Sequence, residues 1–146
     1  MREENMETSV YRPLITQAIQ ALEYSYAPYS HFTVGAALED GAGHIWRGCN
    51  IESAAYSPTC CAERTALFKA VSEGVRDFRA IAIVGKNSDR SVLSDSFTAP
   101  CGVCRQALAE FCDGDFPIIL VNGKGTVQIW TLAEMLPLRF TRKNIE

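Results

Sequence analysis

The chain has 146 residues and a mass of 16.1 kDa, a length that predicts one domain. Lys and Arg number 14 and Asp and Glu number 17, which gives a net charge of −3 and a pI near 5.4. This balance excludes a generally basic nucleic-acid-binding protein, and no apolar run approaches the ~18 residues of a membrane span.

The N-terminal segment, residues 1–9, is polar, and we expect it to be frayed. Apolar residues at helical spacing after Pro13 predict a first helix over residues 13–26. The rest of the chain is predicted to alternate strands and helices, in this order: a strand over 32–39, a turn over 40–43, a strand over 44–51, a helix over 59–74, a strand over 80–85, a helix from 100–101 to 113–114, strands over 117–121 and 126–130, and a helix over 131–136. This order implies an α/β domain whose sheet is covered by helices.

The first thirteen residues are charged and contain no apolar stretch of the kind found in signal peptides. We therefore expect the chain to stay in the cytoplasm, where thiols are kept reduced. In that compartment the six cysteines indicate metal binding or catalysis rather than disulfide bonds.

The strongest motif consists of two short cysteine blocks, each at a predicted helix start. The first is C-A-E-R at Cys61–Arg64, and the second is P-C-G-V-C at Pro100–Cys104, roughly forty residues later. Zinc deaminases combine a first ligand, a glutamate that does not bind the metal, and a P-C-x-x-C block. Three thiolates leave one position open on a zinc ion, as a catalytic site requires. The predicted zinc ligands are therefore Cys61, Cys101 and Cys104.

The residues around Cys61 fit the same chemistry. A helix N-terminus favours a thiolate over a thiol, because its free N–H groups and its dipole stabilise negative charge. Arg64 is placed to donate to a ligand sulfur and so to offset the formal charge of three thiolates on one ion. Glu63 follows Cys61 by two positions, so it can face a metal-bound water without binding the metal. We predict that Glu63 is the catalytic proton shuttle.

Other interpretations of these residues remain open. Cys101 and Cys104 alone resemble a redox pair, which would leave the first block unexplained. A purely structural zinc site would need a fourth ligand. His31 and His44 are the only histidines, and we expect ordinary surface or packing roles for both.

Three further cysteines, Cys49, Cys60 and Cys112, are expected to pack rather than to bind metal. Cys60 is the immediate neighbour of Cys61. Adjacent helical residues point ~100° apart, so both are not expected to bind one ion.

Four separated blocks resemble the short, homo-oligomeric cytidine deaminases, over roughly residues 29–140. These blocks are Tyr29–Leu38 (YSHFTVGAAL), Gly48–Ala54 (GCNIESA), Cys61–Ala66 (CAERTA) and Pro100–Gln106 (PCGVCRQ). The resemblance implies a three-layer α/β/α sandwich with a mixed five-stranded sheet. It also implies hydrolytic deamination of cytidine and 2′-deoxycytidine to uridine and 2′-deoxyuridine, with release of ammonia. One zinc ion per chain would carry the nucleophilic hydroxide, with Glu63 as the proton shuttle.

The same resemblance assigns substrate-binding positions. Phe32 matches an aromatic residue that packs on the pyrimidine, and Ala62 matches a residue whose backbone contacts the base. Asn50 and Glu52 match a pair that hydrogen-bonds the sugar hydroxyls. The two lie two positions apart on a predicted strand, so they share one face.

Two other positions bear on assembly. Tyr56 matches a residue near the subunit contact, and Phe140 matches a C-terminal phenylalanine that reaches the substrate of a neighbouring subunit. A homotetramer with shared active sites is therefore implied. The chain departs from the family pattern at Ser53, where asparagine is frequent, at Leu138–Arg139, where smaller residues are usual, and in its basic tail, residues 141–145.

Three alternatives compete with ordinary nucleoside deamination. A related deaminase would act on another pyrimidine derivative, such as the nucleoside antibiotic blasticidin S. A polynucleotide deaminase would need a basic channel, which the acidic pI disfavours. A zinc-stabilised binding module would unfold when its metal is removed. We expect a small nucleoside as the partner, and neither a nucleic acid nor a membrane.

Overall fold

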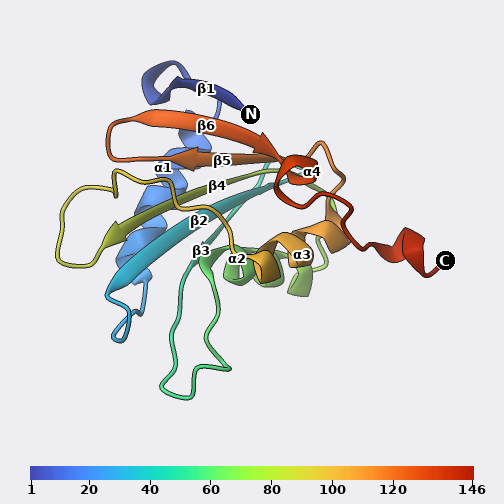
Figure 1. Cartoon of the computed structure of the whole chain (residues 1–146), viewed down its shortest axis with the longest axis horizontal. Coiled ribbons are helices and arrows are strands. Elements are labelled where there is room, and N and C mark those ends of the chain that lie inside the picture. The colour runs from blue at the N-terminus through green and yellow to red at the C-terminus, as the bar shows by residue number, and fades with distance from the viewer.

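Six strands form one mixed sheet in the computed structural model, which describes residues 1–146 (Figure 1). The order across the sheet is β1-β6-β5-β4-β2-β3. Only β4 and β5 run parallel to each other, and every other neighbouring pair is antiparallel. The strands are β1 (Arg2–Asn5), β2 (Phe32–Asp40), β3 (Ile45–Cys49), β4 (Phe78–Asn87), β5 (Pro117–Val121) and β6 (Thr126–Thr131).

Helices cover both faces of this sheet. In Figure 1, α1 lies on one face, while α2 and α3 lie together on the other. The predicted three-layer α/β/α sandwich is confirmed, but the expectation of five strands is wrong, because β1 adds a sixth. None of the helices is both long enough and apolar enough to cross a membrane. The helices are α1 (Arg12–Ala21), α2 (Ala62–Ser72), α3 (Gly102–Phe111) and α4 (Leu132–Met135).

The central strand β4 divides the hydrophobic core into two parts. Successive residues of a strand point to opposite faces, so alternate positions pack on different helices. Ala80 and Ala82 belong to the cluster that contains Leu14 and the other buried residues of α1. Ile81 belongs to the second cluster, which contains buried apolar residues of α2 and α3 such as Leu67 and Leu108. This second cluster holds the starts of α2 and α3 against one face of the sheet.

The N-terminal segment, expected to be frayed, instead forms β1. Its backbone pairs antiparallel with β6 in a register that places Glu3 opposite Gln128. The Gln128 amide donates to the Glu3 carboxylate at 2.9 Å, and the Met1 amino group donates to Glu134 at 2.6 Å. The segment is mostly exposed, so it needs no apolar face. An alternating hydrophobic pattern was therefore absent from its sequence.

Two helix boundaries differ from the predictions. The regular part of α1 ends at Ala21, and a 3-10 turn follows over Leu22–Tyr24. The second helix begins at Ala62 rather than near Thr59, because Cys61 is extended, with φ −72° and ψ 157°, and serves as the N-cap. The Thr59 hydroxyl accepts a hydrogen bond from the Ser53 backbone instead.

Asp40 closes the hairpin between β2 and β3. Its side chain is buried, and its Oδ1 accepts from the backbone N–H groups of Ala42 and His44 at 2.9 and 3.0 Å. Its Oδ2 accepts from Trp46 Nε1 at 3.0 Å. These hydrogen bonds, that of Trp46 first, hold the pKa of Asp40 below its ordinary value. The stabilisation is complete above the unfolded-state pKa of about 3.9 and is lost as pH falls through the lower folded-state pKa.

Replacing Asp40 by Asn is therefore expected to lower the free energy of unfolding at pH 7 by about 1–3 kcal/mol. The Asn side chain is neutral. Its NH2 group would face N–H donors whose hydrogen bonds the Asp40 carboxylate accepts in the wild type. Urea unfolding at pH 7 measures the loss, and the gap to wild type is expected to narrow as the pH approaches 3. Asp89→Asn is the matched control, since Asp89 is exposed. Equal midpoints for the Asp40 variant and wild type at pH 7 would contradict the assignment.

Candidate active site

Three cysteine sulfur atoms converge where α2 and α3 begin. Cys61 is the N-cap of α2, and Cys101 is the N-cap of α3. Cys104 follows in the first turn of α3 and is fully buried. The Sγ atoms of the three residues lie within 4.8 Å of one another, and those of Cys61 and Cys101 are 3.8 Å apart. The structure thus brings together the three predicted metal ligands.

The spacing of these sulfur atoms fits a tetrahedral zinc ion. With Zn–S bonds of ~2.3 Å, two sulfur ligands of such an ion lie ~3.8 Å apart. The Cys61–Cys101 separation of 3.8 Å agrees with this value. No histidine or carboxylate joins the three cysteines within the same 4.8 Å. The group therefore offers three thiolates and leaves one position of a tetrahedral ion open, as a catalytic site requires.

The environment of Cys61 favours its thiolate. The Arg64 guanidinium donates to Cys61 Sγ at 3.6 Å. Hydrogen bonding from the Cys104 thiol, and then from Arg64, lowers the pKa of Cys61 to about 5. A thiolate at neutral pH is the form that binds a metal. The predicted role of Arg64 as a donor to a ligand sulfur agrees with this contact.

Glu63 lies beside these sulfur atoms without joining them. It is in the first turn of α2, and only 4% of its surface is exposed. Burial raises the pKa of its carboxyl to about 7, and the negative charge of Cys61 acts in the same direction. A carboxyl with a pKa near neutrality can both accept and release a proton, as general acid–base catalysis requires.

A backbone bridge holds the Asn50–Glu52 segment next to the cysteine cluster. Ile51 and Cys60 exchange two backbone hydrogen bonds, each of 2.9 Å. Cys60 thus contributes through its backbone, and its half-buried side chain stays outside the sulfur triangle. The sequence offered no signal for this bridge, because an isolated pair of residues produces no hydrophobic pattern.

Asn50 fixes the start of β2. Its Nδ2 donates to the Phe32 carbonyl at 2.8 Å, and its Oδ1 accepts from the Val34 backbone at 2.9 Å. The Ser25 hydroxyl also donates to Oδ1. An amide nitrogen carries two protons, so one donor of Asn50 remains for a ligand.

Glu52 is bound to the loop before β2. Its Oε1 accepts from the backbone N–H groups of Tyr29 and Ser30 at 3.0 and 3.1 Å, and its Oε2 accepts from the Ser30 hydroxyl. The hydroxyl contact lowers the pKa of Glu52, so the side chain is an anion at neutral pH. A carboxylate offers about four acceptor positions, and one of them therefore remains for a sugar hydroxyl.

Phe32 lines a cavity formed with the segment 87–99. The apolar part of the lining includes Val92, Leu93 and Phe97, and the cavity reaches Ala99, two residues before the predicted ligand Cys101. Sequence reasoning assigned no role to this segment because it is polar and irregular. Its turns bring scattered apolar side chains to one wall, and no regular period marks them.

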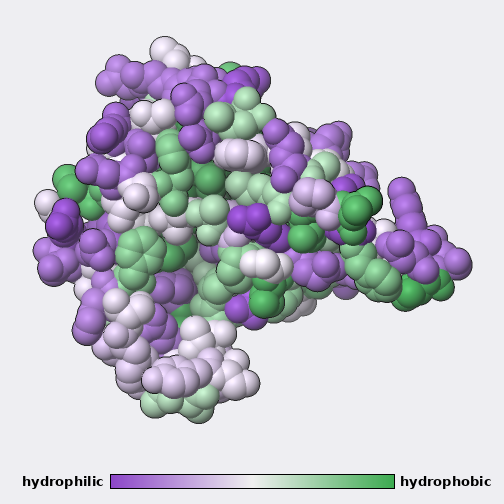
Figure 2. All heavy atoms as spheres, viewed as in Figure 1, coloured by the Kyte–Doolittle hydropathy of each residue, from purple (hydrophilic) through white to green (hydrophobic).

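The remaining predicted residues lie at different depths. Ala62 is fully buried as the first residue of α2. Tyr56 is 76% exposed, on the loop between β3 and α2 that projects from the body in Figure 1. Phe140 is 59% exposed on the C-terminal segment, where Figure 2 shows hydrophobic and hydrophilic residues side by side. Neither Tyr56 nor Phe140 lines the cavity that contains Phe32.

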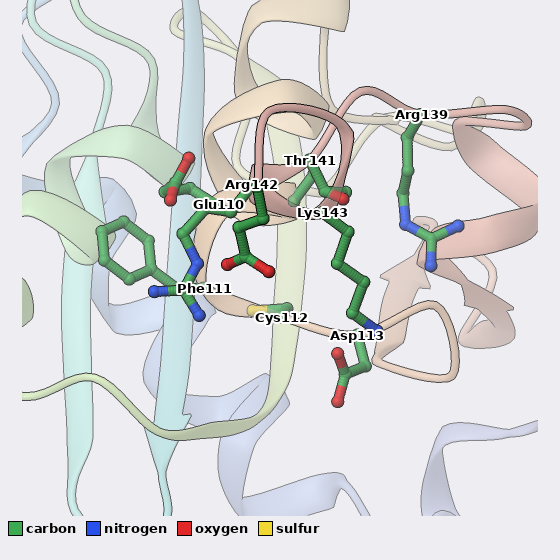
Figure 3. Close-up of a pocket in the computed structure, with 10 residues that line it drawn as sticks. Glu110, Phe111, Cys112, Asp113, Arg139, Thr141, Arg142 and Lys143 are labelled. Atoms are coloured by element: carbon green, nitrogen blue, oxygen red, sulfur yellow. The ribbon is translucent and has the colours of Figure 1, made fainter.

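A second hollow separates the end of α3 from the C-terminal segment (Figure 3). Its lining is mostly charged and includes the acidic residues Glu110 and Asp113 and the basic residues Arg139, Arg142 and Lys143. None of the residues predicted to act in catalysis or binding lies in this hollow.

Comparisons of the sequence and the fold with known proteins find zinc-binding deaminases, in agreement with the cysteine cluster. A family model described as the cytidine and deoxycytidylate deaminase zinc-binding region matches residues 8–120. A cytidine deaminase of Halalkalibacterium halodurans is 51% identical over 132 residues, which cover 90% of this chain and 95% of that protein. A blasticidin-S deaminase of Bacillus cereus is 34% identical over 130 residues, 88% of this chain and 91% of that protein. The crystal structure of cytidine deaminase from Burkholderia pseudomallei superposes with a TM-score of 0.81 at 41% identity, covering 90% of this chain and all of that one.

Proposed function

Because the chain belongs to the cytidine and deoxycytidylate deaminase family, we propose that it hydrolyses cytidine and 2′-deoxycytidine to uridine and 2′-deoxyuridine, releasing ammonia. The observation that carries this proposal is the convergence of three cysteine sulfurs beside the buried Glu63. Cys61, Cys101 and Cys104 would hold the zinc ion, which would supply a water whose pKa is lowered from ~15.7 to ~7.

Glu63 moves the protons of the reaction. Its carboxylate accepts a proton from the attacking water and delivers it to N3 of the pyrimidine, while the oxygen adds to C4. In a second transfer, Glu63 takes the proton of the hydroxyl newly added at C4 and delivers it to the amino group, so that the C4–N bond breaks and the C4 carbonyl forms. Water and the amino compound thus give a carbonyl compound and ammonia. A pKa of about 7 suits a group that must act in both directions.

Four residues would position the nucleoside, and of these Phe32 lines the cavity formed with the segment 87–99. Phe32 packs on the pyrimidine face, and the free N–H groups at the start of α2, where Ala62 lies, contact the base. Asn50 and Glu52 bind the sugar hydroxyls with the donor and acceptor that their protein contacts leave unused. These four roles are supported by the matching sequence blocks and by the proximity of the segments that carry them.

Glu52→Gln is expected to lower kcat/KM for cytidine by about 10–100-fold, mainly through KM, because a charged acceptor for the sugar is lost. Steady-state kinetics with cytidine measures the effect. Glu73→Gln is the matched control, since Glu73 is an exposed residue at the end of α2. An unchanged kcat/KM for the Glu52 variant would remove this residue from the sugar site.

The activity is tested by following the ultraviolet absorbance of cytidine with the zinc-loaded protein. We expect uridine formation, its loss after zinc is removed by a chelator, and its return with added zinc. The likeness to a blasticidin-S deaminase supplies the competing substrate for the same assay. Turnover of blasticidin S in preference to cytidine would overturn the proposed substrate, and a flat trace with both would overturn the proposed reaction.

We further propose a cytoplasmic homotetramer that acts in pyrimidine salvage and shares its active sites between subunits. Several exposed apolar side chains on α2, at the start of α3 and on the C-terminal segment support an assembly: Phe68 at 48%, Val103 at 60%, Leu138 at 103% and Phe140 at 59% exposure. Sedimentation analysis tests it, with a mass of about 64 kDa expected, four times 16.1 kDa.

A further inference from the structure

Arg105 links the metal-binding loop to the end of α4. Its Nε donates to the carbonyl of Pro100, the residue before Cys101, at 2.8 Å. Its Nη1 donates to the carbonyl of Met135, the last residue of α4, at 2.7 Å. One side chain on α3 therefore joins two segments that are far apart in the sequence.

Gln106, the next residue, makes a third connection of the same kind. Its Nε2 donates to the Phe140 carbonyl at 2.8 Å. Gln106 follows the ligand Cys104 by two positions on α3. The backbone of Phe140 is thus attached to the helix that supplies two of the three predicted metal ligands.

The guanidinium of Arg105 is suited to joining the Pro100 and Met135 carbonyls. The last carbonyls of a helix have no partner within the helix, so the Met135 carbonyl needs a donor from elsewhere. A guanidinium is a planar fork that holds two acceptors in a fixed arrangement, while a lysine ammonium is a single point of charge on a flexible stem. Arg105 therefore fixes both the distance and the direction between the two segments.

Near Phe140 the C-terminal segment also contacts the body through Arg139, whose half-buried guanidinium lies close to Gly114. Leu138 is fully exposed and has a positive φ of 51°. The hollow of Figure 3 separates the following residues from the end of α3. The Gln106 hydrogen bond therefore contributes to the position of Phe140, and the Arg105 hydrogen bond fixes the start of the segment at Met135.

We propose that Arg105 and Gln106 are positioning residues, which hold the Cys101 loop and the Phe140 segment in one fixed arrangement. Arg105 acts on the metal through the Pro100 carbonyl, and Gln106 acts on substrate binding through the Phe140 backbone. The expected effects on catalysis rest on the proposed function, whereas the hydrogen bonds that join these segments do not depend on it.

Three variants and one control test the proposal. Arg105→Gln is expected to release zinc to a chromogenic chelator at least about tenfold faster than wild type, because it loses the charged guanidinium. The rate for Arg105→Lys is expected to lie between those of Arg105→Gln and wild type.

Gln106→Glu replaces the amide donor by a carboxylate, which faces the Phe140 carbonyl with a second acceptor. Trypsin is expected to cut this variant after Arg139 at least about tenfold faster, as measured by mass spectrometry. Its zinc release is expected to stay within about twofold of wild type, and KM for cytidine is expected to rise more than kcat falls.

Glu73→Gln is the matched control, because Glu73 is an exposed residue at the end of α2 and does not line the hollow beside the C-terminal segment. Wild-type zinc release by Arg105→Gln, together with wild-type cleavage of Gln106→Glu, would overturn the proposal. If Arg105→Gln does not fold, the rate of zinc release from Arg105→Lys tests the positioning role of Arg105. A wild-type protein that binds zinc but leaves cytidine unchanged would defeat the proposed function, while zinc release and cleavage would still decide the positioning roles.

Discussion

Glu63→Gln is expected to keep one zinc ion per chain and to lose nearly all cytidine turnover. The amide has almost the same shape as the carboxyl, but it does not exchange a proton at neutral pH. Because Glu63 is only 4% exposed, bulk water has little access to replace it. Proton transfer by a positioned group contributes about 10²–10⁴-fold, so kcat is expected to fall by at least this factor.

The measurement combines zinc content by elemental analysis with kcat from the absorbance assay. Full metal content together with lost turnover would assign Glu63 to the proton transfers and not to metal binding. Glu73→Gln, on the same helix, controls for the loss of a carboxylate elsewhere. Substantial turnover by the fully metallated Glu63 variant would refute the proton-shuttle role.

Cys104→Ser is expected to lose both zinc and activity. A serine hydroxyl is not ionised at neutral pH and is a poorer ligand than a thiolate for zinc. Loss of an outer partner of a ligand costs about 10–100-fold in metal affinity, and loss of a ligand is expected to cost more. Competition with a chelator of known affinity measures the change.

Cys60→Ser is the matched control for this variant. Cys60 is adjacent to a ligand in sequence, but its sulfur lies outside the triangle, and its contacts with Ile51 are made by the backbone. We therefore expect wild-type zinc affinity and turnover from it. Zinc loss from the Cys60 variant, or zinc retention by the Cys104 variant, would require a different ligand set.

The cysteine site could be predicted from the sequence because its ligands occupy fixed places relative to helix starts. The two blocks each combine a cysteine with a helix N-terminus, and two such ends side by side suffice to build the triangle. Glu63 followed from the same spacing. Short continuous apolar runs likewise predicted β4 and β5, because both faces of these strands are covered by helices.

Other features were not predictable because their determinants lie far apart in the sequence. The Arg105 guanidinium donates to the Met135 carbonyl, thirty residues away. Every residue has a backbone carbonyl, so no sequence motif marks this one as the acceptor. The contacts of Glu52 with Tyr29 and Ser30 are of the same kind. The start of α2 was misplaced because the backbone before Cys61 is held extended by the bridge between Ile51 and Cys60, which local propensity does not reveal.

The edge strand β1 affects the tendency of the protein to aggregate at high concentration. An unpaired strand edge offers its backbone groups to strands of other molecules, and β6 would present such an edge without β1. The residues that cover it, Arg-Glu-Glu-Asn, are short and charged and make a poor template for further strand addition. Four polar residues remote from the cysteine cluster thus protect the sheet against edge-to-edge aggregation. A fusion partner attached before Met1 would also eliminate the free amino group that Glu134 binds.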